Sequence, residues 1–350
     1  MKILNSINWP ISLTSILLLS IGILVVFSSS KELAIQQLIL TIVGMVFFFL
    51  ISEFRLQSIK NLIRPMYVFI LIMLLITLIL GFETRGSLRW IPLGIFNIQP
   101  SEFAKPILIL VLAKLWSENR PTWLNIFRSL LWTAPYLLLI FIQPDLGSSL
   151  TLVAIWLGML FAARISFKKI AVLILIALIV IPASWFFLHD YQKERISGFL
   201  APESDPLGKG YNLIQSMIAV GSGELTGRGL GRGTQSRLQF LPEFRTDFIF
   251  ASIAEEMGFV GSVLILSLYL YLLLYSLRAA QKVDNAFGFL VILGVVSMLL
   301  FQGVVNIGMN IGLMPITGIT LPLISYGGSS LIATLVSLGM LASSARNKFE

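Results

Sequence analysis

The sequence predicts an all-α polytopic membrane protein with about ten transmembrane helices, and three observations support this fold class. Of its 350 residues, 57% are hydrophobic and only 12% are charged, which is about half the charged fraction of a soluble domain. The apolar residues form separate runs of roughly 17 to 25, long enough for a helix to span about 30 Å of hydrocarbon. Most lysine and arginine residues lie in alternate connections between these runs, as the positive-inside rule requires.

Ten such runs follow one another along the chain and define the expected helices. They cover residues 10–29, 34–52, 65–82, 101–117, 127–143, 148–164, 169–188, 248–277, 287–310 and 322–344. No small-residue cleavage site follows the first run, so we expect that run to remain as a helix. The sequence contains no convincing internal repeat, which gives no support to an inverted-repeat transporter, and we expect a single transmembrane domain over residues 1–350.

The basic residues predict the orientation of these helices. With the N- and C-termini in the cytoplasm, the short outer connections hold only Lys31, Arg85 and Arg89, whereas the inner ones hold Lys2, Arg55, Lys60, Arg64, Lys114, Arg120, Arg128, Arg164, Lys168, Lys169, Arg278, Lys282, Arg346 and Lys348. This orientation makes residues 189–247 a large extracytoplasmic loop. Its seven acidic and seven basic side chains balance, so it is no simple polybasic anchor, and we expect the chemistry of the protein there.

Composition also excludes several kinds of site. The chain has no cysteine and one histidine, His189, which excludes disulfides, thiol nucleophiles and Cys/His metal clusters. A divalent cation such as Mg²⁺ or Mn²⁺ would need carboxylate and phosphate oxygens, and the sequence assigns no metal ligand. The net charge of +8 is explained by the inner connections, so no nucleic-acid partner is expected.

Charged motifs lie just before and inside the fourth predicted helix. The connection "ETRGSLRWIPLG" places Arg89 and Trp90 on the outer side, where Trp90 is either an interfacial anchor or, with the arginines, part of a phosphate or sugar contact. In "QPSEFAKPIL", Glu102 and Lys105 lie three residues apart on one helix face. This pair either has a packing role alone, or Lys105 is a cation held for an anionic ligand or for Glu255.

Two further motifs each have two interpretations. Asp145 in "QPDLGSS" is either the N-cap of the sixth helix or a carboxylate in a cavity. The glycine-rich run "GSGELTGRGLGRGTQ", residues 221–235, is either a flexible turn or an anion-binding nest with Arg228 and Arg232 beside it. It is not a Walker A loop because no GK[ST] follows, and no strand precedes it as a dinucleotide fingerprint requires.

Carboxylates mark the start of the eighth predicted helix. Asp247 is either its N-cap or a general base at the membrane boundary, and the two roles are compatible. Glu255 lies eight residues further on, about 12 Å deeper in the bilayer. Because a bare charge is costly there, Glu255 and Glu256 either line a cavity, pair with other groups, or are protonated. Residues 306–330 mix proline, glycine and amides without a charge, which predicts broken or re-entrant helices lining a central cleft.

The motifs together resemble those of the SEDS family (shape, elongation, division and sporulation), which are polytopic peptidoglycan glycosyltransferases. The resemblance covers nearly the whole chain. It rests on "RWI" at 89–91, "QPSEFAK" at 99–105, "QPDLGSS" at 143–149, "YQKERISGFLAPESDPLGKGYNLIQS" from 191, "GTQ" at 233–235, "LPEFRTDFIFASIAEEMG" from 241 and "LPLISYGGSS" from 321. The segments "GLMPITGI" and "FASIAEE" are closer to the elongation branch than to the division branch. Departures are Pro106 in an ordinarily aliphatic stretch, Glu224 at a common glycine and Arg245 at a common histidine.

The resemblance implies an enzyme that polymerises lipid II, a disaccharide-pentapeptide on undecaprenyl pyrophosphate, into glycan strands for cell elongation and cell shape. It also implies a partner, a class B penicillin-binding protein that acts as the transpeptidase. Asp247 matches the aspartate of the family's TDFIF motif, which implies the general base. Pyrophosphate leaves as a stable anion, so it needs positive charge and no proton.

The implied substrate-binding residues have three roles. Arg195, Lys209 and Lys105 are the candidate cations for pyrophosphate, alone or with a divalent cation. Arg89 and Trp90 are expected to orient sugar or headgroup, and Glu255 to hold or polarise a cationic partner. The complete set is Arg89, Trp90, Glu102, Lys105, Arg195, Lys209, Gln235 and Glu255.

Two other functions compete with the enzyme. The chain could instead be a lipid II flippase or a drug-exporter-like carrier that uses the same ionisable groups as a path, or a scaffold that recruits the transpeptidase. A carrier should have charges reaching across the membrane, whereas here the ionisable groups cluster in the outer half and the outer loop. This asymmetry favours the enzyme.

Overall fold

The computed structural model describes residues 8–80, 82–84, 87–92, 97–238 and 240–346. Ten long helices lie in this part of the chain, one on each run expected from the sequence. They are α1 (Trp9–Ser29), α2 (Lys31–Glu53), α3 (Ile63–Leu80), α4 (Pro100–Glu118), α5 (Trp123–Ile142), α6 (Leu146–Ala162), α7 (Phe167–Ser184), α11 (Ile249–Ala280), α12 (Ala286–Asn310) and α13 (Gly328–Arg346). Seven of these, among the described residues, are long and apolar enough to cross a membrane, and α3 and α6 are apolar but shorter. The predicted all-α polytopic fold is confirmed.

The ends of several helices follow from single side chains. Ser30 accepts a hydrogen bond from the N–H of Leu33 to begin α2, and Thr122 does the same for Asn125 in α5. Asn285 begins α12 in the same way. Pro100 is the first residue of α4, where its missing N–H costs nothing.

Short elements join the long helices. The long connection after α7 holds η2 (Trp185–Phe187), α8 (Asp190–Leu200), η3 (Pro202–Ser204), α9 (Tyr211–Ser222) and α10 (Thr234–Arg237), and η1 (Leu56–Ile59) lies between α2 and α3. Between α3 and α4, β1 (Phe82–Thr84), β2 (Ser87–Pro92) and β3 (Asn97–Ile98) form a small antiparallel sheet in the order β1-β2-β3. This sheet was not predicted, because strands of two to six residues are too short for a clear alternating pattern.

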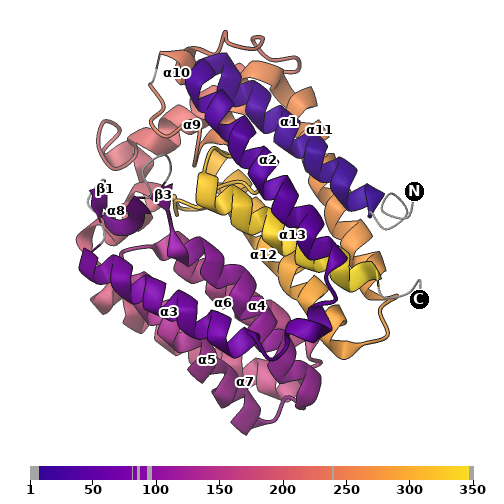
Figure 1. The fold of residues 1–350 in the computed structure, drawn as a ribbon. Coiled ribbons are helices and arrows are strands. Elements are labelled where there is room, and N and C mark those ends of the chain that lie inside the picture. The colour runs from indigo at the N-terminus through magenta and orange to yellow at the C-terminus, as the bar shows by residue number, and fades with distance from the viewer. Residues whose placement is uncertain (1–7, 81, 85–86, 93–96, 239, 347–350) are drawn as a thin grey trace.

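The long helices form two groups that meet along α4 and α12. In Figure 1, α1, α2, α11 and α13 lie on one side and α3, α5, α6 and α7 on the other, while α8–α10 cover one end of the bundle. The first turn of α1 and the last turn of α13 lie at the opposite end. Helix α12 packs against α4, α6, α11 and α13, so the core of the molecule follows its length.

Two of the C-terminal helices differ from their expected form. Residues 311–327 between α12 and α13 are irregular, so the last helix begins at Gly328 and not near residue 322. The eighth predicted helix is interrupted at Gly258, whose φ of 66° and ψ of −162° are non-helical. The expectation of broken helices near the C-terminus is thus confirmed, and the eighth run contains a further break.

The glycine-rich segment repairs the break in α11. The N–H groups of Arg228 and Gly229 donate to the carbonyls of Glu255 and Glu256 at 2.9 and 3.0 Å. In return, Phe259 and Val260 donate to the carbonyls of residues 224 and 225 at 2.9 and 3.1 Å. Backbone groups inside a membrane protein must be paired internally. This exchange gives hydrogen-bond partners to the backbone groups that the break leaves unpaired. The anion-nest interpretation of residues 221–235 is therefore wrong for the N–H groups of Arg228 and Gly229, which are bound to helix carbonyls.

The break at Gly258 should be sensitive to a single methyl group. A Cβ there would lie 2.3 Å from the backbone nitrogen of Gly227, and the positive φ adds strain of roughly 1–3 kcal/mol. We expect Gly258→Ala to lower the melting temperature of the detergent-solubilised protein. The matched control is Gly303→Ala in α12, where a Cβ meets nothing within 4 Å and helix propensity improves by about 1 kcal/mol. Equal melting temperatures for the two variants would contradict this account.

Candidate active site

Asp247 lies on a turn that is fixed by its main chain. Helix α11 starts at Ile249 with Phe248 as its N-cap and no side-chain capping bond, so the interpretation of Asp247 as the N-cap is wrong by one position. The backbone carbonyl of Asp247 accepts hydrogen bonds from the side-chain amides of Asn306 and Asn310 at 2.9 and 3.0 Å. The Asp247 side chain is half-buried. The turn is thus held from behind by α12, while the side chain lies at a partly open surface.

Asn306 and Asn310 belong to the candidate site, and the sequence reasoning did not single them out. Both are fully buried and lie one turn apart on α12. Asn310 also accepts a hydrogen bond from the N–H of Ala251 at 2.9 Å, and Asn306 donates to the carbonyl of Ile319 at 2.7 Å. They connect α11, α12 and the irregular segment 311–327 at one point. Two asparagines four residues apart in an apolar helix were the available signal, because buried amides require partners.

The residues before Asp247 are also held at their main chain. Ser325 donates to the carbonyl of Thr246 at 2.6 Å, and the N–H of Tyr326 donates to the carbonyl of Arg245 at 2.9 Å. The Arg245 guanidinium donates to Ser29 at the end of α1 and lies 4.5 Å from the centre of the Phe244 ring. Burial lowers the pKa of the Arg245 guanidinium from its usual value, which the carboxylate of Glu243 partly offsets. Arg245 therefore ties the turn to α1.

Arg195 is the predicted cation that the structure brings beside Asp247. A Cβ at Gly318 would lie 3.6 Å from Nη1 of Arg195 and 3.7 Å from Oδ2 of Asp247. Gly318 has a φ of +75°, a conformation that suits glycine. Arg195 also donates to the carbonyl of Ile316 at 3.4 Å. A guanidinium and a carboxylate thus both lie beside one glycine of the 311–327 segment.

Tyr191 holds the other side of Arg195. The guanidinium carbon of Arg195 lies 5.8 Å from the centre of the Tyr191 ring, and the phenol donates to the carbonyl of Pro144 at 2.8 Å. Burial raises the pKa of the Tyr191 phenol, although Arg89 and Arg195 oppose this rise. The phenol therefore remains a hydrogen-bond donor at neutral pH, and it connects α8 to the turn before α6.

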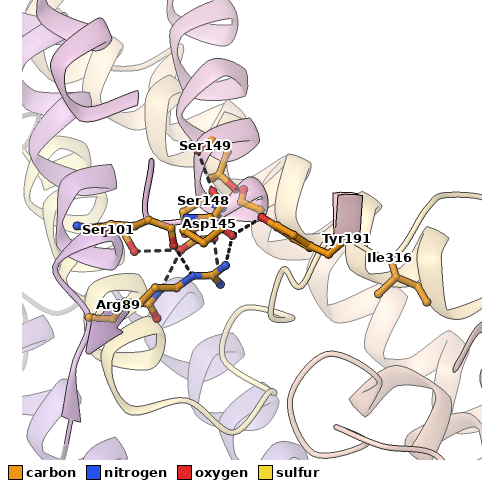
Figure 2. A network of polar contacts seen from close by, with 12 residues as sticks. Arg89, Ser101, Asp145, Ser148, Ser149, Tyr191 and Ile316 are labelled. Atoms are coloured by element: carbon orange, nitrogen blue, oxygen red, sulfur yellow. Dashed lines mark hydrogen bonds and ion pairs between the residues drawn. The ribbon is translucent and has the colours of Figure 1, made fainter. Parts of the chain in front are cut away.

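Asp145 organises a second polar cluster, shown in Figure 2. Its carboxylate accepts hydrogen bonds from the N–H of Ser148 at 3.1 Å, from Gln99 at 2.9 Å and from Ser101 at 3.3 Å. The N-cap interpretation of Asp145 is confirmed. Nη1 of Arg89 lies 3.9 Å from Oδ1 of Asp145.

The other nitrogens of Arg89 are bound to the same turn. Nε donates to the carbonyl of Gln143 at 2.9 Å, and Nη2 donates to the carbonyl of Pro144. Arg89 thus clamps the α5–α6 turn to strand β2, where Trp90 is half-buried beside it. Arg89 was expected to orient sugar or headgroup. In the structure its guanidinium nitrogens already face protein acceptors, and the expected role stays a prediction.

Glu102 and Lys105 form a buried ion pair inside α4. Lys105 Nζ lies 2.7 Å from Oε2 of Glu102, and the residues are 2% and 7% exposed. Of the alternatives for Lys105, pairing with Glu255 is therefore wrong, and the structure shows the ion pair with Glu102 on the same helix. Lys209 instead lies at the surface, 3.5 Å from Glu194, with about half of its side chain exposed.

Glu255 has a different partner from the one expected. Its buried carboxylate accepts hydrogen bonds from Thr234, from the N–H of Gln235 at 2.8 Å, and from the N–H and hydroxyl of Ser236. These are neutral donors at the start of α10, so the expectation of a cationic partner is wrong. Four neutral donors therefore satisfy both oxygens of the carboxylate. Glu255 thereby holds Gln235, whose buried side-chain oxygen has no hydrogen-bond partner among the described residues.

The described residues include no group of three or more His, Cys, Asp or Glu side chains that could hold a metal ion. The arrangement that they do form is a half-buried carboxylate beside one guanidinium. A carboxylate in this setting can accept a proton, and the guanidinium can bind an anionic oxygen.

Comparisons with known proteins show which family the chain resembles. Peptidoglycan glycosyltransferase MrdB of Escherichia coli K12 is 42% identical over 281 residues, covering 79% of this chain and 76% of MrdB. Peptidoglycan glycosyltransferase RodA of Treponema pallidum is 33% identical and matches over 97% of each chain. The crystal structure of the rod shape determining protein RodA of Thermus thermophilus superposes with a TM-score of 0.74 at 29% identity, over 98% of both chains.

A second solved structure is more similar still. A chain from a peptidoglycan synthase complex, in which polymerization and crosslinking are coordinated, superposes with a TM-score of 0.84 at 34% identity over 98% of each chain. The family model for the cell cycle proteins FtsW, RodA and SpoVE matches residues 7–350. The chain therefore belongs to the FtsW/RodA/SpoVE family.

Proposed function

We propose that this protein is a peptidoglycan glycosyltransferase that polymerises lipid II, with Asp247 as the general base. The observation that carries the proposal is the placement of the Asp247 carboxylate and the Arg195 guanidinium around Gly318, on a turn held by two buried asparagines. Relatives named peptidoglycan glycosyltransferase support the reaction class. The transfer requires a base and a cation held close together, and here Asp247 on the turn before α11 and Arg195 on α8 both lie beside Gly318.

The reaction needs one base and one stabilised leaving group. Asp247 takes the proton of the acceptor sugar's 4-hydroxyl as its oxygen forms a bond to the anomeric carbon of the donor. The bond between that carbon and the pyrophosphate oxygen breaks on the opposite face. The electron pair leaves with undecaprenyl pyrophosphate, which is a stable anion and needs no proton.

Positive charge at the leaving group comes first from Arg195. Its guanidinium is the candidate cation beside Asp247, and it can bind two phosphate oxygens at once. Lys209 lies in the same connection as Arg195 and pairs with Glu194, so it can assist from the surface. A divalent cation, if used, would take most of its ligands from the pyrophosphate oxygens, since the described residues offer few.

The proposed setting follows from the charge pattern. Residues 1–350 act as one transmembrane domain of the bacterial cytoplasmic membrane, with both termini in the cytoplasm and residues 189–247 outside. The site then opens at the outer surface, where glycan strands for cell elongation and cell shape are made. A class B penicillin-binding protein is the proposed partner, supported by the similar chain in a solved peptidoglycan synthase complex.

Removing the proposed base should abolish polymer formation without unfolding the protein. Asp247→Asn keeps the shape of the side chain but cannot accept the proton, and we expect a loss of roughly 10²–10⁴-fold. The measurement is glycan polymer formed from purified lipid II. Asp190→Asn is the matched control, because this aspartate lies exposed in the same connection and should retain wild-type activity.

The same variants test the competing function. If wild-type protein made no polymer but moved lipid II across liposome membranes, and Asp247→Asn moved it equally well, the chain would be a flippase. Polymer yield from Asp247→Asn equal to that of wild type would remove Asp247 from the mechanism.

A methyl group beside both charged groups should reduce activity. Gly318→Ala places a methyl within 4 Å of both Arg195 Nη1 and Asp247 Oδ2, and we expect polymer formation to fall by roughly tenfold or more. Gly312→Ala is the matched control, since its φ of +77° imposes a similar backbone cost in the same segment. Its methyl would instead meet the flexible side chain of Met217. Equal losses in the two variants would show that backbone strain alone explains the effect.

Arg195 and Lys209 should contribute unequally to the turnover rate. We expect Arg195→Gln to lower the turnover rate on the order of a hundredfold, because a positioned charge on a leaving group is lost. Lys209→Gln should change the rate only a few-fold, since its ammonium is exposed and paired with Glu194. Steady-state rates at saturating lipid II measure both. A larger effect for Lys209→Gln would reassign the leaving-group cation.

A further inference from the structure

A groove lies between α3 and α5 at the end of the bundle opposite to the candidate active site. Its volume is about 370 Å³, and it is lined by Tyr67, Arg128, Leu131, Trp132 and Pro135. Arg128 precedes Gln143, which lies at the active-site end of α5, by fifteen residues. At 1.5 Å per residue this separation is about 20 Å, so the groove is a separate site.

The walls of the groove are rigid and apolar. The Tyr67 hydroxyl donates to the carbonyl of Trp132 at 2.9 Å, and the two rings meet edge to face at 5.0 Å. The Tyr136 ring stacks on the Tyr67 ring, with 4.5 Å between the ring centres. Leu131 is 56% exposed along the groove. This surface fits an alkyl chain without rearrangement.

Two arginines lie at the same end of the groove. Helices α3 and α5 run in the same direction, because Tyr67 meets Trp132 and, further along both helices, Leu74 meets Gln143. Arg64 precedes Tyr67 by three residues and Arg128 precedes Trp132 by four, so both guanidinium groups begin about one turn below the ring contact. Both side chains are exposed, and Arg128 is oriented by a 3.2 Å hydrogen bond to Asn125.

The surroundings of the two arginines are also basic. Lys60 and Lys114 lie at this end, and Lys114 donates to the carbonyl of residue 60 at 2.9 Å. Arg120 follows α4, while Glu118 is the acidic residue at the end of that helix. None of the groove-lining residues is acidic. A basic pocket between transmembrane helices with an apolar wall is suited to an anionic phospholipid.

We propose that the groove between α3 and α5 binds an anionic phospholipid. Its phosphate would lie between Arg64 and Arg128, and one acyl chain would follow Leu131, Trp132 and Pro135. The site does not depend on the proposed glycosyl transfer, since it lies at the other end of the helices.

The test compares two lipids that differ only in headgroup charge. Delipidated full-length protein in detergent is titrated with dioleoyl phosphatidylglycerol or dioleoyl phosphatidylcholine, and bound lipid is counted by native mass spectrometry. We expect wild type to bind phosphatidylglycerol roughly tenfold or more tightly than phosphatidylcholine, and Arg64→Gln with Arg128→Gln to abolish this preference.

Two further variants separate the groove from general attraction. Arg278→Gln with Lys282→Gln removes the same charge from the last turn of α11 and the connection after it, where both side chains are exposed, and should retain the preference. Leu131→Trp fills the groove while leaving both arginines, and should weaken binding of either lipid. Equal loss in the Arg278/Lys282 variant would mean bulk electrostatic attraction only. Unchanged binding in the Arg64/Arg128 variant or in Leu131→Trp would overturn the proposal.

Discussion

The hydrogen bonds from Asn306 and Asn310 to the carbonyl of Asp247 are the constraint on which the site depends. A buried amide or carbonyl without a hydrogen bond costs several kcal/mol inside a membrane protein. The two asparagines and the irregular chain around them must therefore form hydrogen bonds with each other. In this structure α12 provides both asparagines. They hold the carbonyl of Asp247 and, through Ile319, the 311–327 segment. Because the two amides bind the backbone carbonyl of Asp247, they position its side chain without contacting the carboxylate oxygens.

The break in α11 follows the same rule with different groups. Gly258 takes the backbone out of the helix, which frees carbonyls at residues 255 and 256 and N–H groups at 259 and 260. The glycine-rich segment reaches these groups because positive φ values at Gly227 and Gly229 let its backbone turn against the helix. Glu255 completes the junction by binding the start of α10. The buried acid that was expected to hold a cation therefore joins the long connection to the helix that follows Asp247.

The fold was largely predictable, and the partners of the charged residues were not. Ten helices could be placed because hydrocarbon thickness sets their length, and this constraint acts on each run separately. The break at Gly258 was missed because one glycine barely changes the hydropathy of a 32-residue helix. The N-cap was misplaced because capping is decided by the φ and ψ of a single residue. Glu255 was given a cation because its real donors, residues 234–236, are neutral and some twenty positions away. Asp145 was simpler, since its capping partner Ser148 is three residues away.

The difference between Arg89 and Arg195 explains how one of two similar arginines can serve a ligand. Arg89 donates through Nε and Nη2 to main-chain carbonyls and faces Asp145 with Nη1, so releasing it would leave several buried acceptors unpaired. Arg195 donates a long hydrogen bond of 3.4 Å to the carbonyl of Ile316, and its guanidinium lies over the ring of Tyr191. Exchanging that weak bond for two phosphate oxygens costs little and gains a charge-assisted pair. Tyr191 holds Arg195 through ring contact, which restrains its position without using its donors. Arg195, beside the proposed base, is thus the arginine that can exchange its hydrogen bond for a ligand, whereas Arg89 keeps the neighbouring turn in place.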